Sequence, residues 1–170
     1  MIISVREARP DDAVELLSYL HRVLAEPGIN LINTPEEFKL SVEEEARFLA
    51  DMAGAVNSLY LVAEHEGVII RQVILLGGKR RSIRHATTLG ITIAKEWRGQ
   101  GVGRRLMDEA IAYARSSGVI KRIELQVFVR NQPAIHLYEQ CGFETEGVLR
   151  RAVYRDDEYL DEYVMALLLD

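Results

Sequence analysis

Residues 86–103, ATTLGITIAKEWRGQGVG, decide the fold that the sequence predicts. The first nine residues are rich in β-branched side chains and predict a strand, and helical apolar spacing then runs from Arg104 to Ser116. Between them, Arg98-Gly99-Gln100-Gly101-Val102-Gly103 opens a helix directly after a strand. Such a junction exposes the first N–H groups of the helix and the positive end of its dipole. The stretch therefore predicts an anion-binding loop.

The remaining elements alternate around this junction. We predict further strands at residues 2–5, 59–64, 68–76, 123–129, 143–148 and 158–168, and helices at residues 12–24, 41–53 and 133–141. Asp12 with Glu15, and Ser41 with Glu44, have capping-box spacing. The order β-α-α-β-β-β-α-β-α-β-β predicts an α/β (α+β) fold, a mixed sheet of about seven strands flanked by about four helices. The strand–helix–strand unit at 86–129 should be a parallel crossover.

Composition narrows the class of protein. The chain has 170 residues, 48% of them hydrophobic, which predicts one domain over residues 1–170. A net charge of −5 argues against a general nucleic-acid binder. The single cysteine, Cys141, cannot close an intrachain disulfide, and four histidines without paired spacing suggest no metal site. Without a signal-like or membrane-spanning run, we expect a cytoplasmic protein without membrane contacts.

A second motif follows the strand at 123–129. It reads Asn131-Gln132-Pro133-Ala134-Ile135-His136-Leu137-Tyr138-Glu139-Gln140-Cys141-Gly142-Phe143. Ala134, Tyr138 and Cys141 fall on one apolar helical face. Tyr138 therefore points inward beside the carboxyl edge of a parallel strand pair, where ligands of α/β sheets gather. The alternative is a core tyrosine whose hydroxyl bonds a backbone carbonyl.

These two motifs resemble those of the GCN5-related N-acetyltransferase (GNAT) superfamily, of the bacterial small-amine, amino-acid or protein N-terminal type. Residues 98–103 match its Gln/Arg-x-x-Gly-x-Gly/Ala motif, and residues 131–143 match the Asn…Ala…Leu-Tyr-Glu…Gly-Phe motif that follows. The resemblance implies acetyl-CoA as co-substrate, with pantetheine between the strands at 86–94 and 123–129. It would contact Ile91, Thr92, Ile93, Arg98, Gly99, Gln100, Gly101, Val102, Gly103, Arg104, Asn131, Ala134 and Tyr138. The resemblance also gives Tyr138 the role of facing the thioester sulfur.

The sequence does not single out one residue as the general base. Some protein N-terminal acetyltransferases of this family carry Glu five residues before the Asn of the second motif, where Gln126 stands here and cannot take a proton. Glu124, two residues back on the same strand face, is the candidate base, and a solvated carboxylate is the alternative. Arg71 stands where the family commonly has glycine, and we expect it to reshape the acceptor side. The acidic residues Asp156, Asp157, Glu158, Asp161 and Glu162 are expected to be solvated surface. The alternative, which the resemblance implies, is that this region borders the acceptor entrance and attracts a cationic amine.

The predicted activity is acetyl transfer from acetyl-CoA to a primary amine by direct attack in a ternary complex, with Tyr138 protonating the leaving thiolate. The amine is a small molecule or a protein N-terminus. Family members are often homodimers, and we expect a homodimer here. The alternative is a catalytically silent, CoA-binding sensor or scaffold protein.

Overall fold

A computed structural model describes residues 3–170. Its strands are β1 (Ser4–Glu7), β2 (Leu59–His65), β3 (Val68–Gly77), β4 (Ala86–Ile93), β5 (Arg122–Phe128), β6 (Glu144–Arg155) and β7 (Glu158–Leu168). Its α-helices are α1 (Ala13–Leu24), α2 (Val42–Ala53), α3 (Val102–Ser116) and α4 (Gln132–Gln140). The element order therefore confirms the predicted one.

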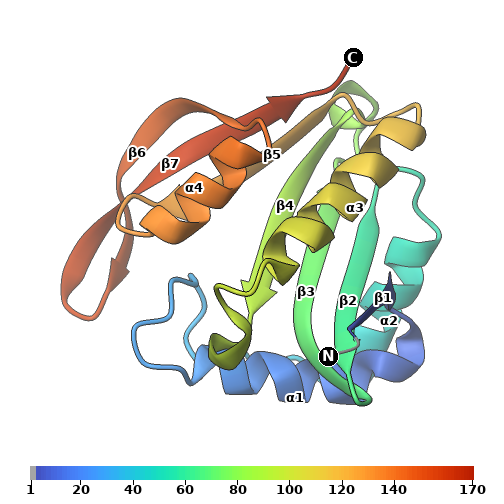
Figure 1. Cartoon of the computed structure of the whole chain (residues 1–170), viewed down its shortest axis with the longest axis horizontal. Helices are drawn as coiled ribbons and strands as arrows, with labels where there is room; N and C mark the ends of the chain where they lie inside the picture. The colour runs from blue at the N-terminus through green and yellow to red at the C-terminus, as the bar shows by residue number, and fades with distance from the viewer. Residues whose placement is uncertain (1–2) are drawn as a thin grey trace.

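The seven described strands form one mixed sheet in the order β1-β2-β3-β4-β5-β7-β6. Every neighbouring pair is antiparallel except β4 and β5, which are parallel. Figure 1 shows α3 crossing in front of β3 and β4, while α4 lies in front of the β5–β7 half. The parallel crossover predicted for residues 86–129 is confirmed.

The two halves of the sheet separate at the parallel pair. β4 bonds β5 only between Ala86–Thr88 and Arg122–Glu124. β4 nevertheless stays paired with β3 up to Ile93, and β5 stays paired with β7 up to Phe128. The facing edges of β4 and β5 therefore diverge beyond Thr88, and we call this divergence the splay. It leaves backbone groups of residues 89–93 without a strand partner on that side.

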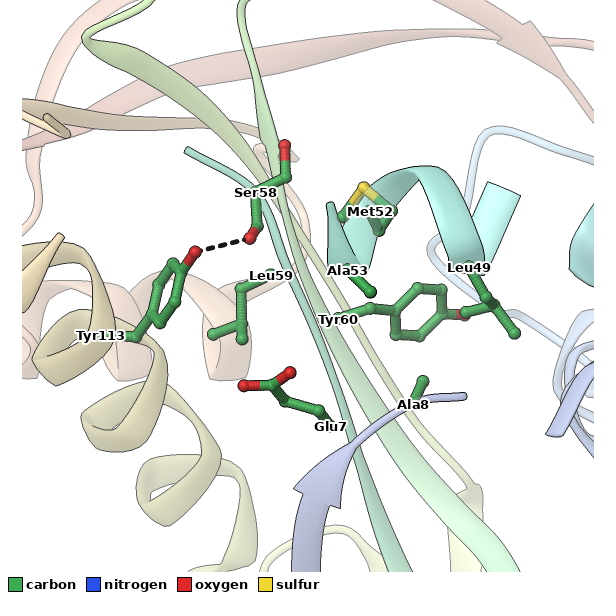
Figure 2. A pocket seen from close by; sticks show the side chains of 9 residues that line it. All are labelled: Glu7, Ala8, Leu49, Met52, Ala53, Ser58, Leu59, Tyr60 and Tyr113. Carbon is green, nitrogen blue, oxygen red and sulfur yellow. Dashed lines mark hydrogen bonds between the residues drawn. The ribbon is translucent and has the colours of Figure 1, made fainter. Parts of the chain in front are cut away.

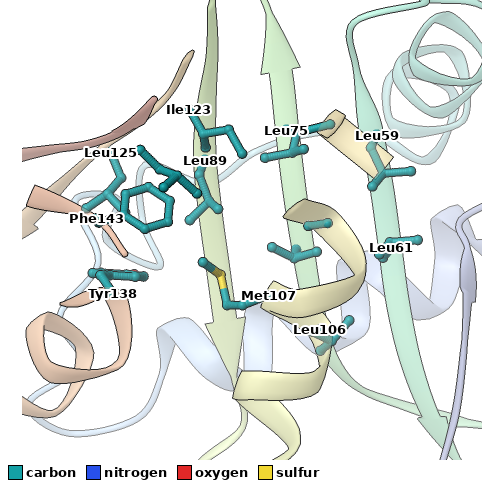
Figure 3. Packing of buried hydrophobic residues seen from close by; sticks show 14 of the residues in the cluster. Leu59, Leu61, Leu75, Leu89, Leu106, Met107, Ile123, Leu125, Tyr138 and Phe143 are labelled. Atoms are coloured by element: carbon teal, nitrogen blue, oxygen red, sulfur yellow. The ribbon is translucent and has the colours of Figure 1, made fainter. Parts of the chain in front are cut away.

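Two apolar clusters cover the two faces of the sheet. On one face, α3 and α4 pack against the sheet through Leu106, Met107, Leu75, Leu89, Ile123, Leu125, Tyr138 and Phe143 (Figure 3). On the other face, α1 and α2 pack through Leu16, Tyr19, Leu49, Met52, Tyr60 and Val62. α1 and α2 pack against β2 and β3, and Tyr19 of α1 reaches Thr92 of β4 at 3.0 Å. The loop between α1 and α2 contacts the β5–β7 half, through Asn30 with Arg130 and Leu31 with Arg155.

Local predictions met different outcomes. Ser41 and Glu44 form the predicted capping box, with bonds of 3.2 and 2.8 Å. The box predicted for Asp12 and Glu15 was wrong, because the Asp12 carboxylate instead pairs with Arg6 at 2.7 Å and accepts the Arg9 N–H. Arg6 also binds Glu64 of β2, so a long-range ion pair outcompetes the local cap.

Two strand boundaries also differ from the prediction. The first strand is Ser4–Glu7 rather than residues 2–5, and residue 2 lies outside the described residues. The strand predicted at 143–148 runs on to Arg155 as β6. A register shift between Leu149 and Val153 lets β6 continue past the polar residues that interrupt its alternation.

Candidate active site at the splay of the sheet

The loop after β4 has the backbone that its glycines allow. Gly99 and Gly101 have φ of +72° and +74°, which L side chains rarely adopt, and Gly101 is the N-cap of α3 without a side-chain cap bond. Two residues after Gly101, a Cβ at Gly103 would lie 3.0 Å from Cδ1 of Ile93, so the first turn of α3 packs closely against the end of β4. The first N–H groups of α3 therefore point out of the sheet beside the open end of the splay.

Ion pairs hold this loop in place. The Arg98 side chain donates from Nε to the Ile93 carbonyl at 2.9 Å and pairs with Glu26, which follows α1. Glu26 also accepts the backbone N–H of Lys95 at 2.9 Å. Arg98 thus fastens the loop to α1 rather than extending freely toward solvent. Its contact with a co-substrate stays a prediction.

Tyr138 occupies the middle of α4, and its side chain is 6% exposed. The centre of its ring lies 5.9 Å from that of Phe143, and Figure 3 shows the two side by side in the cluster. Within residues 3–170 its hydroxyl has no hydrogen-bond partner, so the carbonyl-bonded alternative does not describe it. Burial raises the pKa of Tyr138 above its ordinary value, which keeps the phenol protonated.

Asn131 begins α4 directly after β5. Its backbone carbonyl accepts the N–H groups of Ala134 and Ile135, both at 3.1 Å, while its side chain makes no cap bond. Within the described residues the Asn131 amide group therefore keeps its donors and acceptor for a ligand. Ala134 lies half-buried against the α3–α4 cluster, as its position on the apolar face predicted.

The second face of β5 carries the candidates for the base. Since Ile123, Leu125 and Val127 pack under α3 and α4, Glu124, Gln126 and Phe128 face the other way. We call this second face, over β5 and β7, the acceptor face. The residues of interest there differ in their surroundings.

Glu124 lies at the closed end of the splay, opposite Thr88 of β4. Its carboxylate accepts from Arg122 Nε at 2.8 Å, and the side chain is 41% exposed. Arg122 also binds Glu146 of β6. Glu124 is therefore an ion-paired carboxylate, and its role as base stays a prediction.

Sequence reasoning named Glu162 of β7 only as one of five acidic residues and did not single it out. Glu162 belongs to the acidic run that was expected to be solvated, and this expectation was wrong for it, since it is only 4% exposed. It lies opposite Phe128 of β5, so it is on the acceptor face. The alternation of β7 carries the signal: Met165 and Leu167 fill the α3–α4 cluster, which puts Glu162 among the apolar side chains of the opposite face.

Arg71 is buried in β3 opposite Ile93, one strand away from the splay. It is 1% exposed, and its Nε and Nη2 atoms have no hydrogen-bond partner within the described residues. Burial lowers the pKa of Arg71 to about 10. A buried cation without a partner is costly, and its effect on the acceptor side stays a prediction.

Two hollows lie away from the loop of residues 98–103. The first, of about 140 Å³, lies beside β1 and β2, where the Tyr113 hydroxyl donates to the Ser58 carbonyl (Figure 2). It contains none of the predicted site residues. The second, of about 310 Å³, lies at the end of β5 and is lined by Phe128, Val129, Arg130, Tyr159, Leu160 and Asp161. It adjoins the acceptor face.

Two features, a membrane-spanning helix and a metal-binding cluster, are absent from the part of the chain that the structure describes. No helix of residues 3–170 is long and apolar enough to cross a membrane. No group of three or more His, Cys, Asp or Glu side chains in the same range is arranged to hold a metal ion.

Comparisons with known proteins agree on one family. The model of the acetyltransferase (GNAT) family matches residues 26–143. The L-amino acid N-acetyltransferase AaaT of Escherichia coli (strain K12) is 32% identical over 166 residues, or 96% of each chain. The N-alpha-acetyltransferase of Sulfurisphaera tokodaii is 27% identical over 95% of this chain and 90% of its own. The crystal structure of a GNAT-family acetyltransferase from Streptococcus pneumoniae is 36% identical, has a TM-score of 0.95 and covers 99% of this chain and 100% of its own.

Proposed function

The chain belongs to the acetyltransferase (GNAT) family, and from that premise we propose that it acetylates the α-amino group of a small amino-acid-like substrate. It is an acetyl-CoA-dependent N-acetyltransferase that transfers the acetyl group to an amine. The catalytically silent alternative is not favoured. The single observation that carries the proposal is the splay: the glycine loop of residues 98–103 follows β4, and α4, whose Tyr138 hydroxyl has no hydrogen-bond partner within residues 3–170, follows β5.

We assign the co-substrate to that gap. The N–H groups of Gly99 to Arg104 would hold the diphosphate, because this helix start lacks a side-chain cap and its glycines keep the approach open. The edge of β4 that faces the splay at residues 91–93, where the Ile93 carbonyl already accepts from Arg98, and the Asn131 amide would bond the pantetheine. Charge-assisted bonds of about 1.5–3 kcal/mol each make such a loop an adequate diphosphate site.

The proposed chemistry is a direct transfer. The neutral amine attacks the thioester carbon, the C–N bond forms and the C–S bond breaks. Tyr138 then donates its proton to the departing thiolate, and its protonated, buried hydroxyl suits that role. The amine must first lose a proton, so a carboxylate on the acceptor face has to receive it.

The acceptor class rests on two points. The α-amino group of a peptide N-terminus has a pKa of about 7.7–8.0, against about 10.4 for a lysine-like amine. The pKa of a free amino acid's α-amine lies between these values, because its own carboxylate stabilises the ammonium form, so this amine is neutral more often at pH 7 than a lysine-like one but still needs a base. The relative that matches nearly the whole chain at 32% identity is an L-amino acid N-acetyltransferase. A protein N-terminus offers an α-amine of lower pKa and is the second candidate, since an N-alpha-acetyltransferase also matches nearly the whole chain.

An amine panel tests the proposal. Release of coenzyme A from acetyl-CoA would be followed with a thiol reagent in the presence of amino acids, polyamines and short peptides. We expect release that depends on amino acids and exceeds that with peptides or polyamines. Acetylation of peptides alone would move the assignment to protein N-termini. If no amine of the panel causes release of coenzyme A, the proposed function is contradicted.

Assembly and location belong to the proposal as well. We expect a cytoplasmic homodimer, as the family resemblance and the single cysteine suggest. Light scattering on the purified protein measures the mass directly. A value near the chain mass of 19.3 kDa would rule out the dimer.

A further inference from the structure

Glu162 is a buried carboxylate without a partner on the acceptor face. It lies opposite Phe128 of β5 and Leu149 of β6, and only 4% of it is exposed. Within residues 3–170 it makes no hydrogen bond or ion pair. A buried carboxylate normally has a cation or donors around it. An unpaired one therefore points to a group that arrives from outside.

The surroundings of Glu162 set its proton affinity. Its facing neighbours are apolar or neutral: Phe128, Leu149, Leu160, Val164 and, diagonally, Gln126. Desolvation alone raises the pKa of Glu162 above its ordinary value of 4.5. A carboxylate that takes protons more readily is better matched to a base working near neutral pH.

The charged groups nearby are engaged elsewhere. Arg130, after β5, lies over the Phe128 ring at 5.7 Å and donates to Asn30 at 3.1 Å. Arg155, at the end of β6, donates to the Leu31 carbonyl. Both arginines thus hold the loop between α1 and α2 beside this end of the sheet, and neither neutralises Glu162.

A hollow lies beside the neighbours of Glu162, and Glu162 itself is not among the residues that line it. The hollow of about 310 Å³ is lined in part by Phe128, which lies opposite Glu162. Leu160, the preceding residue of β7 on the same face as Glu162, also lines it. A hollow of this size lies at the low end of the range for small-ligand sites. It lies at the carboxyl end of β5, the end of that strand that is no longer paired with β4.

We propose that Glu162 binds the acceptor's ammonium group and takes the proton that makes it a nucleophile. The assignment rests on the proposed acetyltransferase function and names a catalytic residue for it. Gln126 lies opposite Val164, the next residue of β7 on the same face, so Glu162 is the diagonal neighbour of the amide. The carboxylate thus stands beside Gln126, the position at which some protein N-terminal acetyltransferases of the family carry glutamate.

Two carboxylates flank Gln126, and their surroundings separate them. Glu124 is bonded to Arg122 and 41% exposed, so a positive charge competes with the substrate for it. Glu162 is desolvated and has no ion-pair partner within residues 3–170, so an arriving ammonium group would be the first cation it meets there. This contrast favours Glu162 over Glu124.

The protons balance in this scheme. The ammonium group gives one proton to Glu162, which later passes it to solvent. The nitrogen gives up its second proton as the C–N bond forms and the tetrahedral intermediate collapses. Tyr138 supplies a proton to the thiolate and regains one when it takes this second proton from the nitrogen, so that a neutral amide remains. The net reaction converts ammonium and thioester into amide, thiol and one free proton.

Glu162→Gln, Glu124→Gln and Glu144→Gln test the assignment together. Glu144 is the matched control: it lies opposite Ala166, four residues or about 13 Å along β7 from Glu162, and is exposed. For Glu162→Gln we expect kcat/KM to fall about 10²–10⁴-fold, with the Kd for coenzyme A unchanged. The loss should shrink as the pKa of the acceptor amine falls, which a purely structural role would not produce.

The outcomes are separable. Wild-type kcat/KM in Glu162→Gln, or the large loss in Glu124→Gln alone, would overturn the role of Glu162 and leave the acetyltransferase function standing. A wild-type protein that binds coenzyme A but acetylates no amine of the panel would overturn both. Thermal unfolding checks folding: Glu162→Gln should melt no lower than wild type, because it removes an unpaired buried charge.

Discussion

Replacing Tyr138 by Phe removes one oxygen from the proposed site and nothing else that the fold uses. The hydroxyl is buried and has no hydrogen-bond partner within residues 3–170. Its removal therefore breaks no bond, and the free energy of unfolding should stay the same or rise slightly. The ring keeps its contact with Phe143 at 5.9 Å.

The expected kinetic effect is large. A positioned general acid contributes about 10²–10⁴-fold to a rate, so kcat of Tyr138→Phe should fall by at least about 10²-fold. The Kd for acetyl-CoA should change by less than about threefold, since the diphosphate loop and Asn131 remain. Because burial raises the pKa of Tyr138, the wild-type rate should not decline on the alkaline side up to the ordinary tyrosine pKa of 10.0.

The assay compares Tyr138→Phe with Tyr113→Phe. The Tyr113 hydroxyl donates to the Ser58 carbonyl at 2.8 Å, far from the splay, so its loss should cost about 1 kcal/mol of stability and leave kcat intact. Release of coenzyme A gives kcat, calorimetry gives Kd, and urea unfolding gives stability. Wild-type kcat in Tyr138→Phe would refute the proton-donor role.

Three further perturbations follow from the structure. Arg71→Met should raise the free energy of unfolding by about 1–3 kcal/mol, because it removes a buried guanidinium with two nitrogens unpartnered within residues 3–170. Arg122→Met should lower it, because Arg122 pairs with Glu124 and Glu146, and a lower urea midpoint in Arg71→Met would contradict the reasoning. Gly101→Val should cost about 1–3 kcal/mol at φ of +74° and weaken acetyl-CoA binding in calorimetry, with Gly54→Ala as the neutral control; equal affinities would speak against the loop. Because the pKa of Glu162 is raised, the folded state binds its proton more tightly than the unfolded state, so wild type should lose stability relative to Glu162→Gln as pH rises above 4.5. If urea unfolding from pH 4 to 8 shows a constant difference in unfolding free energy between the two proteins, the raised pKa is contradicted.

The fold could be predicted because local signals and the chain order agree. A β-branched run, a glycine junction and a helical apolar period follow one another in residues 86–116, and only a parallel crossover satisfies all three. Ser41 and Glu44 form their capping box because nothing distant competes for them. Asp12 fails to form one because Arg6, itself bonded to Glu64 of a neighbouring strand, takes its carboxylate. No local pattern encodes that competitor.

The site was predictable where it depends on the backbone. Residues 98–103 and Asn131 lie beside the splay because each follows a strand at the edge where the sheet opens. Glu162 escaped because its sequence neighbours are acidic and a charged run usually indicates solvent. Its burial depends on the pairing of β7 with Phe128 and Leu149, which strand register sets and composition does not.

The central claim is that the splay of β4 and β5 aims a thioester at Tyr138. A crystal structure of the protein with acetyl-CoA tests it most directly. We expect the diphosphate on the N–H groups of residues 99–104, pantetheine between the diverging strands, and the sulfur in contact with the Tyr138 hydroxyl. A co-substrate bound outside the splay, or a sulfur out of reach of that hydroxyl, would contradict the account.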